Sequence, residues 1–402
     1  MKTEQVIPSL ARPFLANSVR LTAPLIRRVM ATIFMLSLFT RQSGAGTLPP
    51  IQTVFIIMLE NSDWSQIASN PSAPYINNSL LPVASYCLQY YNPPGNHPSE
   101  PNYLWLEAGT NFGITNDAAP IVNHQNTTNH LVALLNNTGV TWKSYQEDIS
   151  GTIVPLMPIN DYDPKHDPFV FFDDVTGTND FSFPYGIAHI RPFSELAADL
   201  VNHNVAQYNF ITPNLCDDMH NTCAPLNNPT LQGDSWLATV IPQITNSQAY
   251  QNNGAVFITW DESEDGDCPV GMIVLSSLAK GGGYACTNYY THSSTLRTMQ
   301  EIFGVTPLLG DSVNATDLSD LFVLPGASSS IRLNSCLLAT DGAFQFNVSG
   351  ATPGSTNIIL CSTDLINWTR IGTNVALTGN FCFTNAPASY SSQCFYRVWQ
   401  LR

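Results

Sequence analysis

The first clear pattern along the chain is a nearly continuous run of apolar residues at positions 51–59. It reads Ile-Gln-Thr-Val-Phe-Ile-Ile-Met-Leu and is rich in branched side chains. Strands that are buried on both faces of a parallel sheet have runs of this kind, so we predict a buried strand here. Other apolar runs predict strands at 140–146, 207–212, 254–260 and 272–276, and a strand or a helix–strand pair at 83–91.

Segments with helical periodicity alternate with these strands. Residues 193–202 carry Leu196 and Leu200 on one face, as an amphipathic helix does. Similar patterns predict helices at 128–136, 233–250 and 293–303. The alternation of strands and helices predicts an α/β fold with a mainly parallel sheet flanked by helices.

One long segment, residues 149–186, has little periodicity and is rich in Asp, Pro and Phe. A structureless connection of that length is usually functional. We therefore predict an insertion that covers an active site.

The pattern changes after Leu324. Residues 325–330 read Pro-Gly-Ala-Ser-Ser-Ser and predict a linker. Residues 331–402 consist of short alternating segments separated by Gly, Asn and Pro turns, which predicts a small all-β module, a sandwich. The α/β domain is then expected at residues 46–324.

The N-terminal 45 residues have the features of a targeting segment. Arg27 and Arg28 precede an apolar run at 29–39, and small residues follow at 43–45. This pattern indicates a secretory signal peptide, or an uncleaved anchor, behind an N-terminal extension. We expect a secreted, periplasmic or cell-surface protein.

Charge narrows the range of partners. Charged residues make up 11% of the chain, and its net charge is −15. An acidic chain of this kind is a poor candidate for binding nucleic acid through bulk electrostatics, so we expect no nucleic-acid partner.

The nine cysteines indicate disulfides with one odd thiol if the protein is exported. Close pairs along the chain are Cys216 with Cys223, Cys268 with Cys286, and Cys382 with Cys394. Cys336 and Cys361 remain in the last segment and Cys87 is left over, but the spacing alone does not decide the connectivity.

Ser99 lies in a segment that predicts a helix start. Pro98 and Pro101 flank it, an apolar helical face follows from Tyr103, and Gly109 can end the helix. Free N–H groups and the helix dipole at such a start favour an anion, although serine is also a common helix cap.

Polar clusters follow the ends of predicted strands. Glu60-Asn61 follows the run at 51–59, Asp261-Glu262 follows the strand at 254–260, and Asp217-Asp218-Met219-His220 follows the strand at 207–212. Ligand sites of open α/β sheets lie at the carboxyl ends of strands. Asp261 and Glu262 could bind a hard or borderline cation together with Glu60, although the acidic stretch that begins at Asp261 could also be a solvated loop.

Several motifs together resemble a known family. They are Ile56 to Asn61, His97-Pro98-Ser99-Glu100-Pro101-Asn102-Tyr103, Pro213 to His220, Thr259-Trp260-Asp261-Glu262 and Thr291 to Thr298. In this order they look like the phosphoesterase family of bacterial acid phosphatases and phospholipases C, which belongs to the alkaline-phosphatase-like superfamily. The resemblance covers about residues 51–324 and implies that superfamily's fold.

The resemblance implies a metal site and a nucleophile. Glu60, Asn61, Asp261 and Glu262 would hold a divalent cation, and Ser99 would be both the nucleophile and a metal ligand. A serine hydroxyl is a weak nucleophile until a metal or a base activates it, which agrees with these roles.

The resemblance also implies contacts with phosphate. Asn102 would bind a phosphate oxygen. Asp218, His220 and His292 match positions that bind a second metal in two-metal relatives, whereas such histidines contact phosphate in one-metal relatives. His220 lies two residues after Asp218, where the two-metal relatives have a spacing of four, so we expect one cation, with a second as the alternative.

The function expected from these observations is a secreted, metal-dependent phosphoric-ester hydrolase of acid-phosphatase type, acting on a small phosphoester or a phospholipid. One alternative is a phospholipase C, because the phenylalanines and aspartates of residues 149–186 could form an apolar entrance that attracts choline. Another is a non-catalytic adhesion or glycan-binding protein, in which residues 331–402 contact a cell surface or polysaccharide.

Overall fold

The computed structural model describes residues 48–264, 266–324, 331–338, 343–364, 366–377, 379–385 and 395–400. The predicted targeting segment at 1–45 and the predicted linker at 325–330 lie outside these residues. Within the described ranges, no helix is long and apolar enough to cross a membrane.

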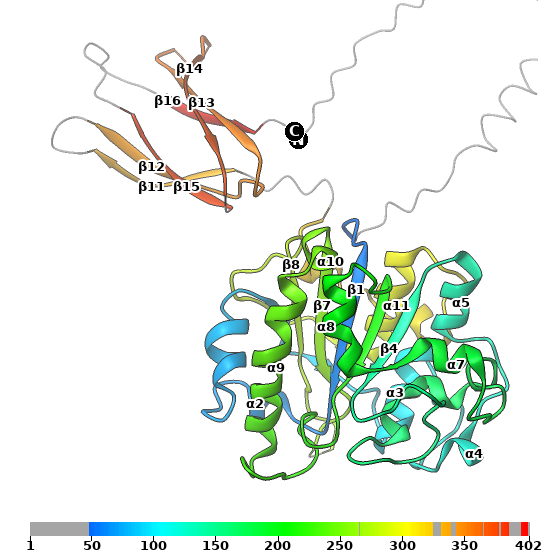
Figure 1. The fold of residues 1–402 in the computed structure, drawn as a ribbon. Helices are drawn as coiled ribbons and strands as arrows, with labels where there is room; N and C mark the ends of the chain where they lie inside the picture. The colour runs from blue at the N-terminus through cyan, green and yellow to red at the C-terminus, as the bar shows by residue number, and fades with distance from the viewer. Residues whose placement is uncertain are drawn as a thin grey trace, which may run out of the picture. The chain divides into compact units, whose positions relative to one another are not determined.

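The centre of the α/β part is an eight-stranded sheet (Figure 1). The five strands from β5 to β7 are parallel to one another, whereas β8 runs antiparallel to both of its neighbours, β7 and β2. The predicted mainly parallel sheet is therefore confirmed. In spatial order the strands are β5 (Ile190–Pro192), β4 (Trp142–Gln146), β6 (Tyr208–Thr212), β1 (Thr53–Leu59), β7 (Gly254–Trp260), β8 (Met272–Ser276), β2 (Ser85–Cys87) and β9 (Tyr284–Cys286).

The apolar run that opens the sequence forms β1, between β6 and β7. Every residue of β7, and every residue of β1 after Thr53, is buried. Strands in this position have covered faces and two hydrogen-bonded neighbours, which explains why both are apolar throughout. Each fully buried large side chain contributes roughly 1.5–3 kcal/mol, so these two strands form the middle of the core.

Helices cover both faces of the sheet (Figure 1). One layer contains α3 (Ser99–Ala108), α5 (Leu131–Thr138) and α11 (His292–Phe303), and the other contains α8 (Leu196–Val201), α9 (Pro229–Thr245) and α10 (Gln248–Gln251). The predicted glycine ends are confirmed, since Gly109 and Gly304 take left-handed φ values of 68° and 66°. Shorter elements are α2 (Trp64–Ile67), a π-helical turn (Ile76–Leu80), α4 (Pro120–Asn123), 3-10 turns at Phe193–Glu195, Gly310–Val313 and Ser319–Leu321, and a two-stranded parallel sheet of β3 (Tyr90–Tyr91) and β10 (Tyr290–Thr291).

The insertion at 149–186 is more ordered than predicted. It contains the 3-10 turns η2 (Pro164–His166) and η3 (Pro168–Phe171), then α6 (Asp173–Thr176) and the start of α7 (Pro184–His189). Asp163 and Asp167 cap the two 3-10 turns through their side chains. Turns of three or four residues are too short to create a periodic pattern, which is why this segment looked structureless in the sequence.

The C-terminal residues form two three-stranded antiparallel sheets. Phe346, Val348 and Ile359 are their buried core, and the rings of Phe346 and Tyr396 pack across the two sheets with centroids 5.2 Å apart. The all-β prediction is confirmed, while the exact limits of a separate module stay a prediction. The sheets consist of β11 (Arg332–Leu338), β12 (Phe344–Ser349) and β15 (Asn380–Asn385), and of β14 (Thr369–Val375), β13 (Thr356–Ser362) and β16 (Phe395–Gln400).

The cysteine pattern is confirmed only in part. Cys216 and Cys223 form a disulfide with Cα atoms 5.7 Å apart, and Cys361 is also disulfide-bonded. Cys268 and Cys286, which are close along the chain, form no disulfide with each other, and Cys286 lies directly opposite Cys87 on the neighbouring strand. Cys394, which is close to Cys382 along the chain, lies outside the described residues.

Candidate active site

Two pairs of polar residues meet at the carboxyl edge of the sheet. Leu59 and Trp260 are opposite each other in the register of β1 and β7, so Glu60-Asn61 and Asp261-Glu262 leave the sheet side by side. The ladder continues there, with the Asp261 amide donating to the Leu59 carbonyl at 3.0 Å. Glu60 and Asp261 are completely buried, which is the convergence that the strand ends predicted.

Ser99 joins these carboxylates from the start of α3. Its Oγ lies 3.1 Å from Glu60 Oε2 and 3.5 Å from Glu262 Oε1. The residue is the first of the helix, one position inside the cap at Pro98. The positive end of the helix dipole therefore lies close to the serine hydroxyl, and the Glu100 amide of the first turn donates to Asp117 Oδ1 at 3.0 Å.

Two asparagine side chains hold Glu262. Asn61 Nδ2 donates to Glu262 Oε1 at 3.3 Å, and Asn102 Nδ2 donates to Glu262 Oε2 at 3.3 Å. The Asn61 amide also donates to Asp261 Oδ1 at 3.0 Å. Asn61 adopts a positive φ of 24°, a conformation in which asparagine is enriched. The residues predicted around Ser99 are thus brought together.

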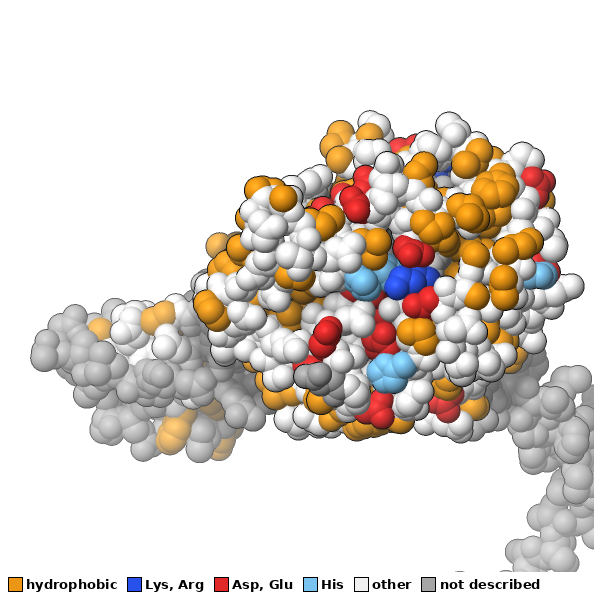
Figure 2. Space-filling view, turned by 90° about the horizontal axis from the view of Figure 1, so that it is seen from below, with side chains coloured by type: hydrophobic (Ala, Val, Ile, Leu, Met, Phe, Trp, Pro, Cys, Tyr) orange, Lys and Arg blue, Asp and Glu red, His pale blue; other side chains and the backbone are white. Residues whose placement is uncertain are grey.

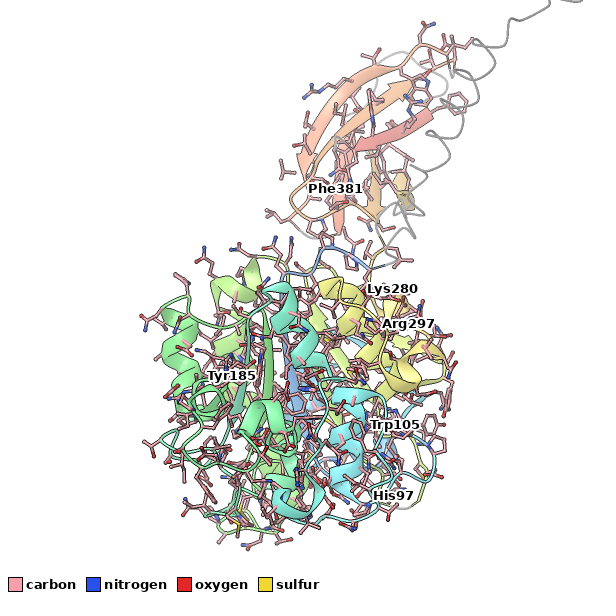
Figure 3. The ribbon with its side chains drawn as sticks, turned by 90° about the vertical axis from the view of Figure 1, so that its right-hand side faces the viewer. His97, Trp105, Tyr185, Lys280, Arg297 and Phe381 are labelled. Carbon is pink, nitrogen blue, oxygen red and sulfur yellow. A yellow bond between two sulfur atoms is a disulfide. The ribbon has the colours of Figure 1, made fainter. Side chains whose placement is uncertain are left out.

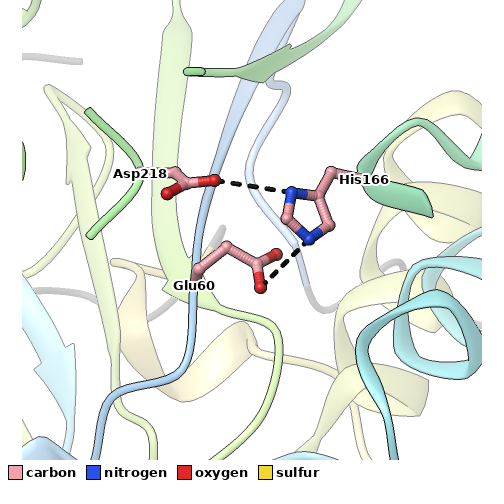
Figure 4. Close-up of side chains that lie close together, drawn as sticks. All are labelled: Glu60, His166 and Asp218. Carbon is pink, nitrogen blue, oxygen red and sulfur yellow. Dashed lines mark ion pairs between the residues drawn. The ribbon is translucent and has the colours of Figure 1, made fainter. Parts of the chain in front are cut away.

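A buried histidine that the sequence did not predict lies beside them (Figure 4). His166 Nε2 is 3.3 Å from Glu60 Oε2, and His166 Nδ1 is 3.4 Å from Asp218 Oδ2. The ring of Tyr103 stacks on His166 at 5.3 Å, while its hydroxyl donates to Glu60 Oε1 at 2.5 Å. Burial and the nearby charge of Lys165 lower the pKa of His166 well below its usual range.

The residue before it, Lys165, is the basic group at the mouth of the site. Burial lowers its pKa, but the charges of Asp117 and Glu60 outweigh that effect and raise it, so the ammonium keeps its charge. Lys165 Nζ lies 3.4 Å from Asp117 Oδ2. Figure 2 shows basic, acidic and histidine side chains gathered on this face.

His220 lies at the same rim. Its backbone amide donates to Asp218 Oδ1 at 2.8 Å, and its ring centroid is 5.9 Å from that of His166. Its side chain is exposed, and its Nδ1 lies 2.8 Å from Asn221 Oδ1. The predicted Asp218 and His220 are therefore near the cluster, with His220 open to a substrate.

His292 lies in a buried environment that the sequence did not predict. It is completely buried, with Nε2 2.5 Å from the Asp261 carbonyl oxygen and Nδ1 3.1 Å from the Tyr90 hydroxyl. Both ring nitrogens are thus occupied by the protein. His292 therefore contacts the backbone of Asp261, and its predicted contact with phosphate or a second metal stays a prediction.

His97 is a second histidine that sequence reasoning missed, although it lies inside a quoted motif. Its Nδ1 pairs with Glu262 Oε2, and its Nε2 is 3.3 Å from Asp267 Oδ1. Figure 3 shows it at the end of the domain where α3 begins, with Trp105 farther along that helix. The only signal in the sequence was its position two residues before Ser99.

The electrostatics of the cluster are those of a cation site. Burial raises the pKa values of Glu60, Asp218 and Asp261, that of Asp261 to about 8, and neighbouring carboxylates add to each rise. Buried oxygens of Asp218, Asp261 and Asn61 have no hydrogen-bond partner. Unpaired buried oxygens and crowded carboxylates both fit a divalent cation, which prefers oxygen and imidazole ligands.

Comparisons with known proteins agree with this geometry. A model of the Phosphoesterase family matches residues 85–306, more than half of the chain. This chain belongs to the phosphoesterase family. It is therefore a hydrolase of phosphoric esters, and the resemblance read from the motifs is confirmed.

Three proteins illustrate what this chain is similar to. The chain is 30% identical to a phosphatidylinositol-3-phosphatase of Mycobacterium tuberculosis, over 69% of this chain and 85% of that protein. It is 29% identical to an acid phosphatase of Aspergillus niger, over 63% and 58%. It is 30% identical to a phosphate-repressible acid phosphatase of Penicillium chrysogenum, over 63% and 59%. The chain thus spans less than two thirds of both fungal phosphoesterases.

Solved structures resemble this phosphoesterase more distantly. A protein of the alkaline phosphatase superfamily from Vibrio parahaemolyticus overlaps 75% of this chain and 77% of its own, with a TM-score of 0.46 and 11% identity. That likeness is too distant to bear on function.

Proposed function

We propose that this phosphoesterase is an exported phosphomonoesterase of acid-phosphatase type that uses Ser99 as its nucleophile. The observation that carries the proposal is the environment of the Ser99 hydroxyl. It lies 3.1 Å from Glu60 Oε2, beside buried carboxylates and at the start of a helix. A hydroxyl, a proton acceptor and N–H donors in one place are what phosphoryl transfer to a serine requires.

In the proposed reaction, Ser99 Oγ attacks phosphorus while the bond between phosphorus and the ester oxygen breaks. Glu60 Oε2 takes the hydroxyl proton, and the Tyr103 hydrogen bond holds the other oxygen of that carboxylate. Asn102 and the first N–H groups of α3 donate to the phosphoryl oxygens. The released ester oxygen takes the proton from Glu60. Water then attacks the phosphoserine and gives one proton to Ser99 Oγ, and inorganic phosphate leaves.

We propose one divalent cation, held by Glu60, Asn61, Asp261 and Glu262 together with Ser99. When bound, it supplies positive charge that lowers the pKa of the serine hydroxyl and stabilises charge on the phosphoryl oxygens. The second group of potential ligands, His166 and Asp218, shares Glu60 with it. We assign His166 and Asp218 to orienting Glu60, and a second cation there is the alternative.

A phosphomonoester is the substrate class that the rim favours. A phosphomonoester carries close to two negative charges at neutral pH, because its second pKa is about 6, whereas a diester carries one. Lys165 and His220 lie where that extra charge would be. Of the five phenylalanines that could form the apolar entrance of a phospholipase C, Phe169, Phe171 and Phe172 are completely buried, whereas Phe181 is exposed and Phe183 is half-buried. The phospholipase C therefore remains the alternative.

The deciding experiment measures hydrolysis of four substrates by one preparation, with and without chelator. They are a chromogenic phosphomonoester, its diester, phosphatidylcholine and phosphatidylinositol 3-phosphate, the last because one relative is named for it. We expect both monoesters to be cleaved faster than the other two, and chelator to abolish turnover. Faster cleavage of phosphatidylcholine would move the protein to the phospholipase C branch. Activity that does not change with chelator would contradict the proposed metal dependence.

Export and surface contact are proposed on separate grounds. The run at 29–39 and the disulfide between Cys216 and Cys223 support passage into an oxidising compartment. Residues 331–402 are proposed to contact cell wall or polysaccharide. Cell fractionation tests the first proposal, and a pull-down on insoluble glycans, with and without residues 331–402, tests the second.

A further inference from the structure

Two buried cysteines that the proposed mechanism does not use face each other at one end of the sheet. Cys87 is the last residue of β2 and Cys286 the last residue of β9, and the two are direct partners in a parallel pair. Cys87 is 0% exposed and Cys286 is 2% exposed. Because direct partners on parallel strands point to the same face, their sulfur atoms lie on the same side of the sheet.

Both cysteines are free thiols in this structure, and the spacing of paired strands is compatible with a covalent bond between them. Neighbouring strands lie about 4.7–4.9 Å apart, inside the range of roughly 4.4–6.8 Å that disulfides span between Cα atoms. Both sulfurs also meet the same residue, Asn288. Cys87 Sγ donates to the Asn288 carbonyl at 3.3 Å, and the Asn288 amide donates to Cys286 Sγ at 3.4 Å.

We propose that Cys87 and Cys286 form a disulfide in the mature protein. The two thiols lose two protons and two electrons, and one S–S bond forms between them. A small-molecule or protein disulfide accepts the electrons and protons and leaves as two thiols. This exchange is the same one that joins Cys216 to Cys223.

The bond must form during folding. Burial raises the pKa of the Cys87 thiol to about 12, and only the thiolate takes part in exchange. The folded, reduced protein is therefore slow to oxidise. Refolding in the presence of a disulfide oxidant gives both thiols access before the sheet closes over them.

The position of the bond connects it with the active site. Tyr90 follows Cys87 by three residues, and His292 follows Cys286 by six. These two residues meet next to Asp261, where Tyr90 binds His292 Nδ1 and His292 Nε2 binds the Asp261 carbonyl. Between them, β3 and β10 pair in parallel. The proposed disulfide ties together the two segments that hold Asp261 in place.

The direct test is a peptide map of the full chain, refolded with oxidised glutathione, alkylated in denaturant and digested without reductant. We expect a peptide containing Cys87 linked to one containing Cys286. Recovery of both residues in alkylated form, with Cys216 and Cys223 linked in the same digest, would overturn the proposal. The wild-type protein alone decides this result, so a variant that fails to fold does not obscure it.

Variants test the stabilising role. Cys87→Ser, Cys286→Ser and the double variant should lower Tm by a similar amount, roughly 5 °C or more, because each removes the same bond. Thermal inactivation should shift with Tm. The matched control is the same set of proteins refolded with reductant, in which the difference in Tm between wild type and the variants should shrink. Additive losses in the double variant, or no loss at all, would contradict a bond between the two sulfurs.

Discussion

The hydroxyl of Ser99 is the atom on which the proposed chemistry depends. It is 3% exposed, and its nearest polar neighbours are carboxylate oxygens of Glu60 and Glu262. In a purely structural role, a serine at this helix start would bond a free N–H of the first turn, but no side-chain cap is formed there. The orientation toward carboxylates favours the nucleophile over the helix cap.

Replacing Ser99 by alanine should reduce kcat for a phosphomonoester by about 10³-fold or more, because no other group can form the covalent intermediate. The free energy of unfolding should change little, since the loss of one hydrogen bond costs about 0.5–1.5 kcal/mol. Steady-state rates and urea unfolding measure the two effects. The matched control is Ser62→Ala, another buried serine at the same edge, whose hydroxyl binds the Glu60 carbonyl. Near-normal turnover by the Ser99→Ala protein would show that Ser99 is not the nucleophile.

The charge of Lys165 should distinguish monoesters from diesters. Lys165→Gln should lower kcat/KM for a phosphomonoester by about 10- to 100-fold and for its diester by much less, since one charge contact is lost. Lys165→Arg keeps the charge and should recover part of the activity. Parallel kinetics on the two substrates provide the measurement. An equal loss on both would show that Lys165 acts through the packing of the insertion.

At the scale of elements, the strand ends were the most predictable part of the site. The apolar runs that became β1 and β7 stop one residue before Glu60 and Asp261, so the chemistry follows directly from the pattern. His166 was not predictable in this way. It lies in a 3-10 turn of three residues, where no periodicity exists, and only the folded insertion brings it to Glu60. The burial of His292 was not predictable either, because sequence cannot show which side of a strand end a helix start faces.

Removal of the proposed cation should destabilise this edge of the sheet. Without it, the buried carboxylates of β1 and β7 repel each other and remain unpaired. We expect chelator to lower Tm by several degrees at pH 7 and added Mn²⁺ or Zn²⁺ to restore it, as a ligand of the folded state does. Differential scanning calorimetry and metal analysis of the purified protein measure this. A Tm that changes with neither chelator nor added metal would contradict the proposed cation site.

The contact between α3, α5 and α6 should make stability depend on pH. His130 is buried between Glu107, at 3.1 Å, and Asp174, at 3.0 Å. Burial lowers its pKa, but the hydrogen bonds to Asp174 and Glu107 outweigh that effect and raise it to about 9. Since the folded pKa exceeds the unfolded value of about 6.5, the stabilisation is complete below about pH 6.5 and is lost as the pH rises through 9.

The free energy of unfolding in urea, at pH 6, 8 and 10, tests this contact. Wild type should exceed His130→Gln by roughly 1–3 kcal/mol at pH 6, and the difference should shrink toward pH 10. A difference that stays constant with pH would show that His130 acts by packing against Phe172 rather than by its charge.

At the scale of the whole molecule, the change of hydrophobic period after Leu324 predicted two kinds of architecture, and both are present. The spacing of hydrophobic residues along the sequence distinguishes buried strands and helices from short alternating strands. It therefore predicts the fold class well. Strand order is different. The eight-stranded sheet is built from distant segments, and nothing in the local pattern of β2 or β9 indicates that they are neighbours.

Deletion of residues 331–402 should leave phosphomonoester hydrolysis within about two-fold of the full chain. Every residue in the proposed site lies before this region, and its sheets have their own core. Circular dichroism and Tm must first show that the shortened protein folds, with Ser99→Ala in the same background as the inactive control. A folded but inactive truncation would mean that these residues contribute to catalysis.

The site is assembled from residues at positions 60, 99, 218 and 261 of the sequence, joined by a sheet whose strands are far apart along the chain. Such long-range contacts form late in folding. The chain loses entropy when it closes long loops, and only afterwards do the new contacts compensate for that loss. A newly made or unfolded chain therefore has no hydrolase activity. If the chain crosses a membrane before folding, the cell that makes it is protected from its own phosphatase without a propeptide or an inhibitor, and activity begins only at its destination.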